Sequence, residues 1–518
     1  MTEKSKNIAF YLLTGLLVLS SFWSIYKYGV DVPHWDDHAV RNFVDGFQLK
    51  SFFEIFSFHN EHRIGVTRIA ALNTDWVAGR LNYKALMYTG QLALVGLLGI
   101  YIYLKERFKF PALLLFIIAL FIFNNSTFEN SLWAMAGMQN HWVLFLSVGS
   151  LLLLIKSQFT EEGQKLWFVL SVLSSFLAMY SSANGLLTAP IGLLLLFFIG
   201  KRKPMLIWLA IHVVLVATYF IGFQSFGMSK RPHLEDFFLN LFALAGSLAT
   251  PIANINSPMG LTQIIGLINI ILAVWLFFKL LFRKNNQTEF LSYIALTSFY
   301  LGTMVLISVS RSDYERQVLL TSKYKVYSLL LLANTLFFWI KKEKIEAINK
   351  SFAIILVSGL LVFLNLQFSF LDDLKATFRE RMADQTNLQL LGVPYLPENN
   401  ALTEAILKES FITDASKIDS IALQKESIDF FENDLRSESE NFVLAKGPTP
   451  NQLVPVNPDY VFFKSQSKGT AQLFLYNFPS DIYQLHYLEL TDGKVKIYNA
   501  QKTIRIEGVP YESAPKNW

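Results

Sequence analysis

Residues 8–38 read IAFYLLTGLLVLSSFWSIYKYGVDVPHWDDH, an apolar run followed within a few residues by two adjacent aspartates. A membrane-spanning helix needs about 20 predominantly apolar residues, and the run 8–29 has this length. It continues into Trp23, Tyr26 and Tyr28, residue types that collect at membrane interfaces. Because no small-residue cleavage site is evident, we predict an uncleaved first membrane span and not a signal peptide.

The composition of the whole chain agrees with a membrane protein. Of 518 residues, 53% are hydrophobic and only 16% are charged, whereas a soluble domain carries about 25% charged residues. Ten further apolar runs are candidate spans: 85–104, 110–125, 138–155, 166–183, 185–200, 205–223, 261–282, 290–309, 326–340 and 351–371. The expected fold class is an all-α polytopic membrane protein with about eleven transmembrane helices. The absence of cysteine excludes disulfide scaffolds, cysteine nucleophiles and thiolate metal sites.

Basic clusters set the predicted orientation, because Lys and Arg collect in cytoplasmic loops. Eleven alternating spans place every cluster inside, provided that the stretch 237–250 forms a re-entrant or interfacial helix and does not cross. These clusters are Lys4/Lys6, Lys105/Arg107/Lys109, Lys156/Lys165, Lys201/Arg202/Lys203, Arg283/Lys284 and Lys341/Lys342/Lys344. We therefore expect a cytoplasmic amino terminus and an extracytoplasmic tail. Outer loops then include 30–83, 126–140 and 310–325, and they hold nearly all the unusual polar residues of the membrane half.

Residues 371–518 differ in character from the rest of the chain. They carry 15 basic and 21 acidic residues, whereas residues 1–370 carry 30 and 19. The region 372–440 predicts helices, with amphipathic runs at 401–407 and 418–431. Alternating patterns then predict strands at 441–445, 460–463, 471–476, 482–490 and 494–498. We expect a transmembrane domain over 1–371 and a small extracytoplasmic α+β domain over 372–518.

Asp36 and Asp37, in the first outer loop, are the strongest candidates for chemistry. Adjacent carboxylates at the mouth of a membrane bundle are costly to bury, so ionisable residues there indicate function. The alternative is a solvated loop in which an aspartate caps the next helix.

The sequence HNEHR, which begins at His59, gives the same loop a second cluster of charge. On a helix, His59, His62 and Arg63 would share one face. Such a face suits an anion clamp built on Arg63 and Arg68, which is the interpretation we favour. A divalent metal is one alternative, with Asp37, His59 and His62 as ligand candidates. A helix cap with solvated charges is the other.

Two later outer loops add polar and basic side chains. The candidates for substrate or phosphate binding there are Glu129, Asn130, Trp133, Gln139, Arg311, Arg316, Lys323 and Tyr324. Basic residues outside run against the usual bias, and a lipid phosphate would explain them, because guanidinium groups fit phosphate oxygens. Interfacial tryptophans and local salt bridges to Asp313 and Glu315 are the simpler explanations.

Together these features suit glycosyl transfer from a lipid phosphate. An acceptor hydroxyl loses a proton as it attacks the anomeric carbon, and a positioned aspartate can accept that proton. The leaving phosphate needs cations where its charge develops. One displacement with a single base inverts the anomeric centre.

The motifs WDDH, HNEHRI, ENSLWAMAGMQ and SKY resemble those of poorly characterised bacterial membrane proteins of the GT-C glycosyltransferase type. The resemblance covers about residues 1–370 and implies a polyprenyl-phosphate-linked sugar donor used on the extracytoplasmic face. It implies that Asp36 is the base and Asp37 its orienting or metal-binding neighbour. Glu61, with the two residues after it, matches the group's NEHR motif without an assigned role. Lys323 stands where the group tends to have arginine, which keeps the charge but loses the bidentate fork.

The sequence therefore predicts an inverting glycosyltransferase of a bacterial inner membrane. Its acceptor would be an envelope glycan, lipid or protein, its other partner membrane lipid, and a divalent metal would be optional. The scattered basic residues give no reason to expect nucleic-acid binding. A lipid-linked glycan flippase, an envelope polysaccharide polymerase or ligase, and a non-catalytic scaffold are the alternatives. The near absence of charge inside the spans argues against the flippase.

Overall fold

A computed structural model describes residues 3–223, 234–251, 258–282, 286–311, 316–340, 349–375, 377–378 and 381, and six strands of the tail. The chain divides into two compact units. Unit 1 comprises Met1–Gly29, Phe47–Asn73 and Ala85–Leu374. Unit 2 comprises Val30–Gly46, Thr74–Lys84 and Lys375–Trp518. The predicted outer loop 30–83 therefore contributes residues to both units.

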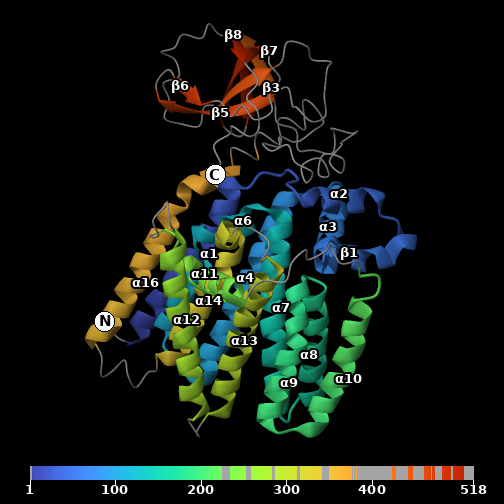
Figure 1. Cartoon of the computed structure of the whole chain (residues 1–518), viewed down its shortest axis with the longest axis vertical. Helices are drawn as coiled ribbons and strands as arrows, with labels where there is room; N and C mark the ends of the chain where they lie inside the picture. Colours follow the sequence, from blue (N-terminus) through green and yellow to red (C-terminus); the bar gives the residue numbers. More distant parts are fainter. Residues whose placement is uncertain are drawn as a thin grey trace. The chain divides into compact units, whose positions relative to one another are not determined.

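Unit 1 is a helical bundle with one small β-hairpin (Figure 1). The last five residues of α3 and the first two of α4 belong to unit 2. Its elements are α1 (Glu3–Tyr28), η1 (Leu49–Phe56), β1 (Phe58–His59), β2 (His62–Arg63), α3 (Gly65–Ala78), α4 (Tyr83–Phe108), α5 (Ala112–Ile122), η2 (Asn125–Thr127), α6 (Phe128–Leu132), α7 (Ala134–Phe159), α8 (Gln164–Met179), η3 (Ala183–Leu187), α9 (Thr188–Ile199), α10 (Arg202–Tyr219), α11 (Leu234–Ala245), η4 (Ser247–Ala249), α12 (Pro258–Leu281), α13 (Gln287–Ser310), η5 (Arg316–Leu320), η6 (Ser322–Tyr324), α14 (Lys325–Trp339) and α16 (Asn349–Ser369).

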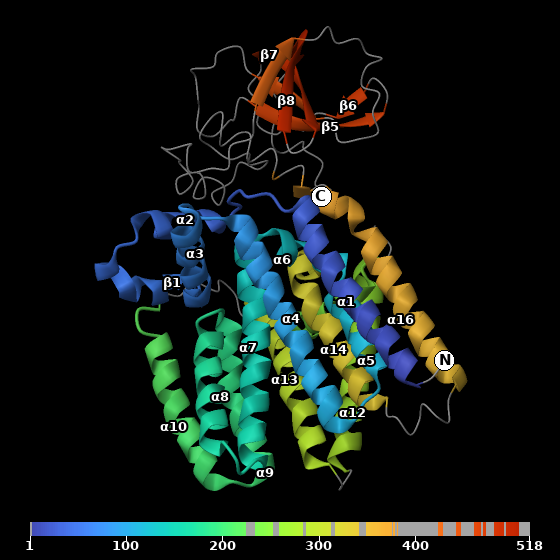
Figure 2. The same cartoon turned by 180° about the vertical axis from the view of Figure 1, so that it is seen from behind.

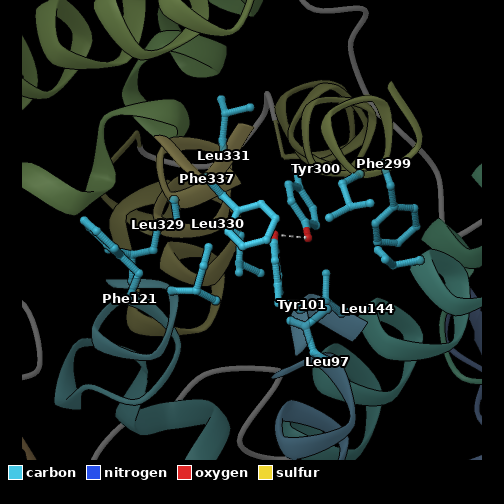
Figure 3. Close-up of a cluster of buried hydrophobic side chains, with 14 of the residues drawn as sticks. Leu97, Tyr101, Phe121, Leu144, Phe299, Tyr300, Leu329, Leu330, Leu331 and Phe337 are labelled. Atoms are coloured by element: carbon cyan, nitrogen blue, oxygen red, sulfur yellow. Dashed lines mark hydrogen bonds between the residues drawn. The ribbon is translucent and has the colours of Figure 1, made fainter. Parts of the chain in front are cut away.

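Helix α5 marks the interior of unit 1. All 11 of its residues are apolar and buried, and it packs against α1, α14 and α16 (Figure 2). A helix that is apolar on every side needs apolar neighbours all round. Nearby, Tyr101 of α4 and Tyr300 of α13 share a hydrogen bond of 3.1 Å between their hydroxyls, surrounded by Leu, Phe and other apolar side chains (Figure 3). This bond satisfies two buried hydroxyls that would otherwise be costly in an apolar core.

Among the residues that the structure describes, eight helices are long and apolar enough to cross a membrane. They are Asn7–Tyr28, Tyr83–Phe108, Ala112–Leu132, Ala134–Phe159, Arg202–Tyr219, Gly260–Leu281, Gln287–Ser310 and Leu356–Lys375. This result confirms the predicted helical, multi-pass membrane architecture at that level of detail. The other three predicted spans coincide with shorter helices, α8, α9 and α14, so the count of eleven stays a prediction.

The stretch 237–250 forms α11 and η4 and not a full-length span. A helix of 12 residues is about 18 Å long, well short of a hydrocarbon core of about 30 Å. It packs against α12, where Gly246 and Gly266 let the two backbones meet. A Cβ on either glycine would lie 1.8 Å from a backbone oxygen of the facing helix. This close packing fits a short helix whose second half is buried in protein.

Unit 2 contains α2 (Asp37–Gly46) and a six-stranded sheet in the tail. The strands are β3 (Leu423–Ser427), β4 (Phe442–Lys446), β5 (Tyr460–Ser467), β6 (Thr470–Gln472), β7 (Asp481–Thr491) and β8 (Lys494–Ile506). Their order is β3-β8-β7-β4-β5-β6, with β3 parallel to β8 and the other neighbours antiparallel.

The sheet corrects one sequence expectation. The run 418–431 was expected to be helical, but its residues 423–427 form β3. The register pairs Leu423 with Val495, so the hydrogen bonds come from a strand about seventy residues later, which local periodicity does not reveal. The predicted strands 441–445, 460–463, 482–490 and 494–498 coincide with β4, β5, β7 and β8. Run 401–407 and most of 471–476 lie outside the described residues.

Candidate functional site

The acidic turn, residues 31–38 of unit 2, leads into α2. Asp37 is the first residue of α2 and is buried, and its carboxylate accepts a hydrogen bond of 3.1 Å from the His34 backbone N–H. Asp36 is half-buried, and its carbonyl accepts from the backbone N–H of Ala39 at 3.1 Å. Asp37 is therefore buried and stabilises the turn, while Asp36 is partly accessible to solvent.

Trp35, immediately before the two aspartates, has a strained backbone. Its φ of 46° lies in the left-handed region, which a bulky L-residue rarely adopts. Such a conformation costs about 1–3 kcal/mol and persists only where the surroundings enforce it. Backbone outliers of this kind gather at functional sites, so the strain supports a functional reading of Asp36.

Asp31 anchors the start of the acidic turn, and sequence reasoning missed it. Its carboxylate lies 2.8 Å from the guanidinium of Arg80 and accepts the backbone N–H of Tyr83 at 2.6 Å. The only hint in the sequence was a third aspartate shortly before the pair. These contacts join the turn to the residues where α4 begins and hold its position.

His38 is a buried titratable group of the turn. Burial, reinforced by the positive charges of Arg41 and Arg381, lowers the pKa of His38 to about 3. Its buried Nδ1 has no hydrogen-bond partner among the described residues. At neutral pH the ring is therefore uncharged.

The HNEHR sequence forms a hairpin and not the helix expected from its spacing. His59 in β1 pairs with His62 in β2, and Asn60 at the turn has a φ of 50°. Asn tolerates this left-handed conformation better than most residues, which favours a tight turn over a helix. Cross-strand partners share one face, so the two histidines stay neighbours, while Arg63 follows on the opposite face of its strand.

Arg63 donates its hydrogen bonds to backbone carbonyls of unit 1. Its Nε lies 2.6 Å from the carbonyl oxygen of Tyr219, and its terminal nitrogens donate to the carbonyls of Phe56 and Ile221. Its guanidinium carbon lies 4.1 Å from the ring centroid of Phe58. Two of these carbonyls belong to the end of α10 and the turn after it, where a cation is favoured.

Arg68 has a similar arrangement at the end of η1. It donates to the carbonyls of Glu54, Ile55 and Ser57 at 2.9, 3.2 and 2.7 Å. Burial lowers the pKa of Arg68 to about 10, still well above neutral pH. The contacts of both arginines favour structural roles, and the predicted anion clamp gains no support from them.

Two loops that were predicted separately meet in unit 1, in a group of residues that we call the α6 cluster. It comprises Glu129, Asn130, Trp133, Lys323 and Tyr324. Glu129 accepts the backbone N–H of Lys323 at 2.9 Å, and Asn130 donates to the Lys323 carbonyl at 2.9 Å. The Lys323 ammonium lies 5.7 Å from the ring centroid of Trp133 and 5.2 Å from that of Tyr324. Aromatic rings thus hold a lysine in place, which keeps Lys323 a candidate contact for an anionic group.

The remaining predicted residues are less informative. Glu61 is half-buried beside the hairpin turn, and Arg311 caps the end of α13. Arg316 begins η5, but its side chain lies outside the described part of the structure, as do Asp313 and Glu315. The Nε2 of Gln139 is buried without a hydrogen-bond partner among the described residues.

Of the three metal-ligand candidates, Asp37 belongs to unit 2, whereas His59 and His62 belong to unit 1. Within the described part of the chain, no three His, Asp or Glu side chains gather closely enough to hold a metal ion. His62 instead accepts the backbone N–H of Ala183 through Nδ1 at 3.3 Å. Comparisons with models of protein families, with curated proteins and with solved structures find no match for this chain.

Proposed function

We propose that this protein is an inverting glycosyltransferase of GT-C type. It moves a sugar from a polyprenyl-phosphate donor to an envelope glycan, lipid or protein acceptor at the extracytoplasmic face of a bacterial inner membrane. The observation that carries the proposal is the acidic turn, in which a half-buried Asp36 follows directly on a strained Trp35. The eight apolar helices add a reason for a lipid-borne substrate, because its isoprenoid tail can lie beside them.

Asp36 is the proposed general base. Its carboxylate accepts the proton of the acceptor hydroxyl while the hydroxyl oxygen forms a bond to the anomeric carbon. The bond from that carbon to the phosphate oxygen breaks, and polyprenyl phosphate leaves with the electron pair. Asp37 is the less suitable base, because it is buried and its carboxylate already accepts the His34 N–H. Its proposed role is to hold the turn.

The test is a transfer assay in membrane vesicles that contain equal amounts of folded wild type, Asp36→Asn or Asp45→Asn. Each sample receives a panel of radiolabelled polyprenyl-phosphate sugars and an envelope extract as acceptor. We expect Asp36→Asn to lower transfer at least about a hundredfold, since a general base contributes about 10²–10⁴-fold. Asp45, an exposed carboxylate on α2, is the matched control and should leave transfer unchanged.

Two outcomes would contradict the assignment. Transfer that survives in Asp36→Asn but disappears in a folded Asp37→Asn variant would move the base to Asp37. No transfer by the wild type from any donor, in extracts that support a known transferase of this type, would remove the proposed function.

A further inference from the structure

A polar pocket lies in unit 1 between α1, α4, the turn from η2 to α6, and α16. We call it the serine–amide pocket, because hydroxyl and amide side chains dominate its polar lining. The residues that carry the argument are Ser20, Ser24, Gln91, Asn125, Ser131 and Gln367. All six lie within candidate membrane spans. Burying polar side chains among membrane-spanning helices costs free energy, so polar side chains around a cavity there indicate a functional site.

Gln91 lines the pocket with a buried amide. Its side chain is 2% exposed, and its Oε1 has no hydrogen-bond partner among the described residues. Leaving a buried amide oxygen unpaired costs about 1–3 kcal/mol. A ligand that donates a hydrogen bond to this oxygen would recover that free energy.

The other lining groups show which chemistry fits. Ser20 and Ser24 donate to the carbonyls of Leu17 and Ser20, at 3.0 and 3.1 Å, so their oxygens keep only acceptor capacity. Gln367 accepts the backbone N–H of Asn125 at 3.2 Å and fixes the opposite wall. The pocket therefore presents serine oxygens as acceptors, together with the side-chain amide N–H groups of Gln91 and Gln367 and the hydroxyl of Ser131.

These groups discriminate among ligand classes. An ionised phosphate or carboxylate oxygen only accepts hydrogen bonds, so it would leave the Gln91 Oε1 without a donor, and no basic side chain among the described residues lines the pocket to balance its charge. An ammonium group donates, but no carboxylate lines the pocket to balance its charge. A neutral hydroxyl both donates and accepts, and it suits the lining.

The size of the pocket limits the ligand to one or two hydroxyl groups. Its free volume is about 20 Å³, roughly the room that one water molecule needs, and it is partly open. The helices beside it expose large apolar side chains, Leu16 and Leu19 on α1 and Leu364 and Phe368 on α16. A lipid can therefore lie against α1 and α16 while a hydroxyl of its headgroup enters the pocket.

We propose that the serine–amide pocket binds a hydroxyl group of an uncharged, sugar- or glycerol-bearing membrane lipid. This inference does not depend on the proposed glycosyl transfer, since it concerns a different set of residues. Gln91 supplies the central hydrogen bonds, and the serine oxygens accept from the same or a neighbouring hydroxyl.

The test measures lipid binding to the full chain in phosphatidylcholine nanodiscs by native mass spectrometry. The probe is monoglucosyl diacylglycerol, titrated against wild type, Gln91→Leu and Ser24→Ala. We expect saturable binding by the wild type that weakens roughly tenfold in Gln91→Leu, as for loss of one buried hydrogen-bonding group. Ser24→Ala, a small change that leaves the bundle intact, should weaken binding severalfold. Gln263→Leu on α12, outside the pocket, is the matched control and should bind as the wild type does.

Three outcomes would overturn the proposal. Binding no stronger than the phosphatidylcholine background, or equal in wild type and both pocket variants, would mean that the pocket holds water only. Competition by free glucose at matched concentration would contradict a lipid source. The Asp36→Asn variant should bind the lipid probe as the wild type does. Loss of lipid binding is therefore distinguishable from loss of the proposed sugar transfer.

Discussion

At the scale of single residues, Arg63 shows how a side chain predicted to bind an anion can be structural. Its guanidinium reaches three backbone carbonyls from two separate segments of unit 1. A lysine keeps the charge but cannot match that fork. We expect Arg63→Lys to lower the free energy of unfolding by roughly 2–3 kcal/mol, measured as a fall in the thermal unfolding midpoint of the detergent-solubilised protein. Arg107→Lys, an exposed change on α4, should have no effect.

The opposite pattern would restore the anion clamp. If Arg63→Lys unfolded at the wild-type temperature but lost sugar transfer, Arg63 would act on substrate and the structural role argued here would be wrong.

His38 gives the acidic turn a predicted pH dependence. Its pKa of about 3 in the folded chain lies below the usual value of 6.5, so folding favours the neutral ring. The corresponding stability is complete above pH 6.5. It is lost as the pH falls from 6.5 towards 3, by about 1.4 kcal/mol per pH unit, because only the unfolded chain then takes up the proton.

The measurement compares thermal stability from pH 8 to pH 4 in wild type and His38→Gln, which cannot titrate. We expect the wild type to lose stability more steeply below pH 6.5. Parallel curves for the two proteins would contradict the neutral, buried state of His38.

At the scale of elements, glycines set how closely helices approach around the α6 cluster. A Cβ on Gly137 of α7 would lie 2.3 Å from the carbonyl oxygen of Asn130, and a Cβ on Gly90 of α4 would lie 2.9 Å from the backbone of Gly137. Small residues at such crossings allow close helix packing in membranes. We expect Gly137→Ala to destabilise the protein by about 1–3 kcal/mol through overpacking.

The matched control is Gly99→Ala, on α4, where a Cβ would meet open space. It should leave the thermal unfolding midpoint unchanged or raise it slightly, since alanine favours helix more than glycine. An equal effect of both substitutions would show that helix propensity and not the crossing decides the result.

The long apolar helices were predictable from the sequence because each carries its own signal. The run 110–125, for example, contains all of α5, whose eleven apolar residues need no partner to be recognised. The hairpin of His59 and His62 was not predictable, because two-residue strands are too short to show alternation. Strand β3 was missed for a related reason, since its parallel partner lies far along the chain.

The residues of the candidate site were predictable from the sequence, but their contacts were not. Asp36 and Asp37 were recognisable from their place after the first span, and Glu129 and Lys323 from their polar loops. Their partners were not, because the contact between Glu129 and Lys323 links residues 194 positions apart. Asp31 and Arg80 likewise meet across the intervening loop. A single sequence marks the residue types but does not say which of them meet.

At the scale of the whole molecule, the predicted orientation decides which sugar donors the protein can reach. The chain has no cysteine, so single cysteines introduced into it can report the side of the membrane without background labelling. Glu54 in η1 and Glu162, in the turn after α7, are both exposed. The predicted topology places Glu54 outside and Glu162 inside.

We expect a membrane-impermeant maleimide to label Glu54→Cys in intact cells and to label Glu162→Cys only after permeabilisation, with the cysteine-free wild type unlabelled. The reason is the basic clusters, which favour the cytoplasm and flank the connection that contains Glu162, at Lys156 and Lys165. The reverse labelling would place the outer loops in the cytoplasm. Polyprenyl-phosphate donors presented on the outer face would then be out of reach of those loops, and the proposed function would fail with the topology.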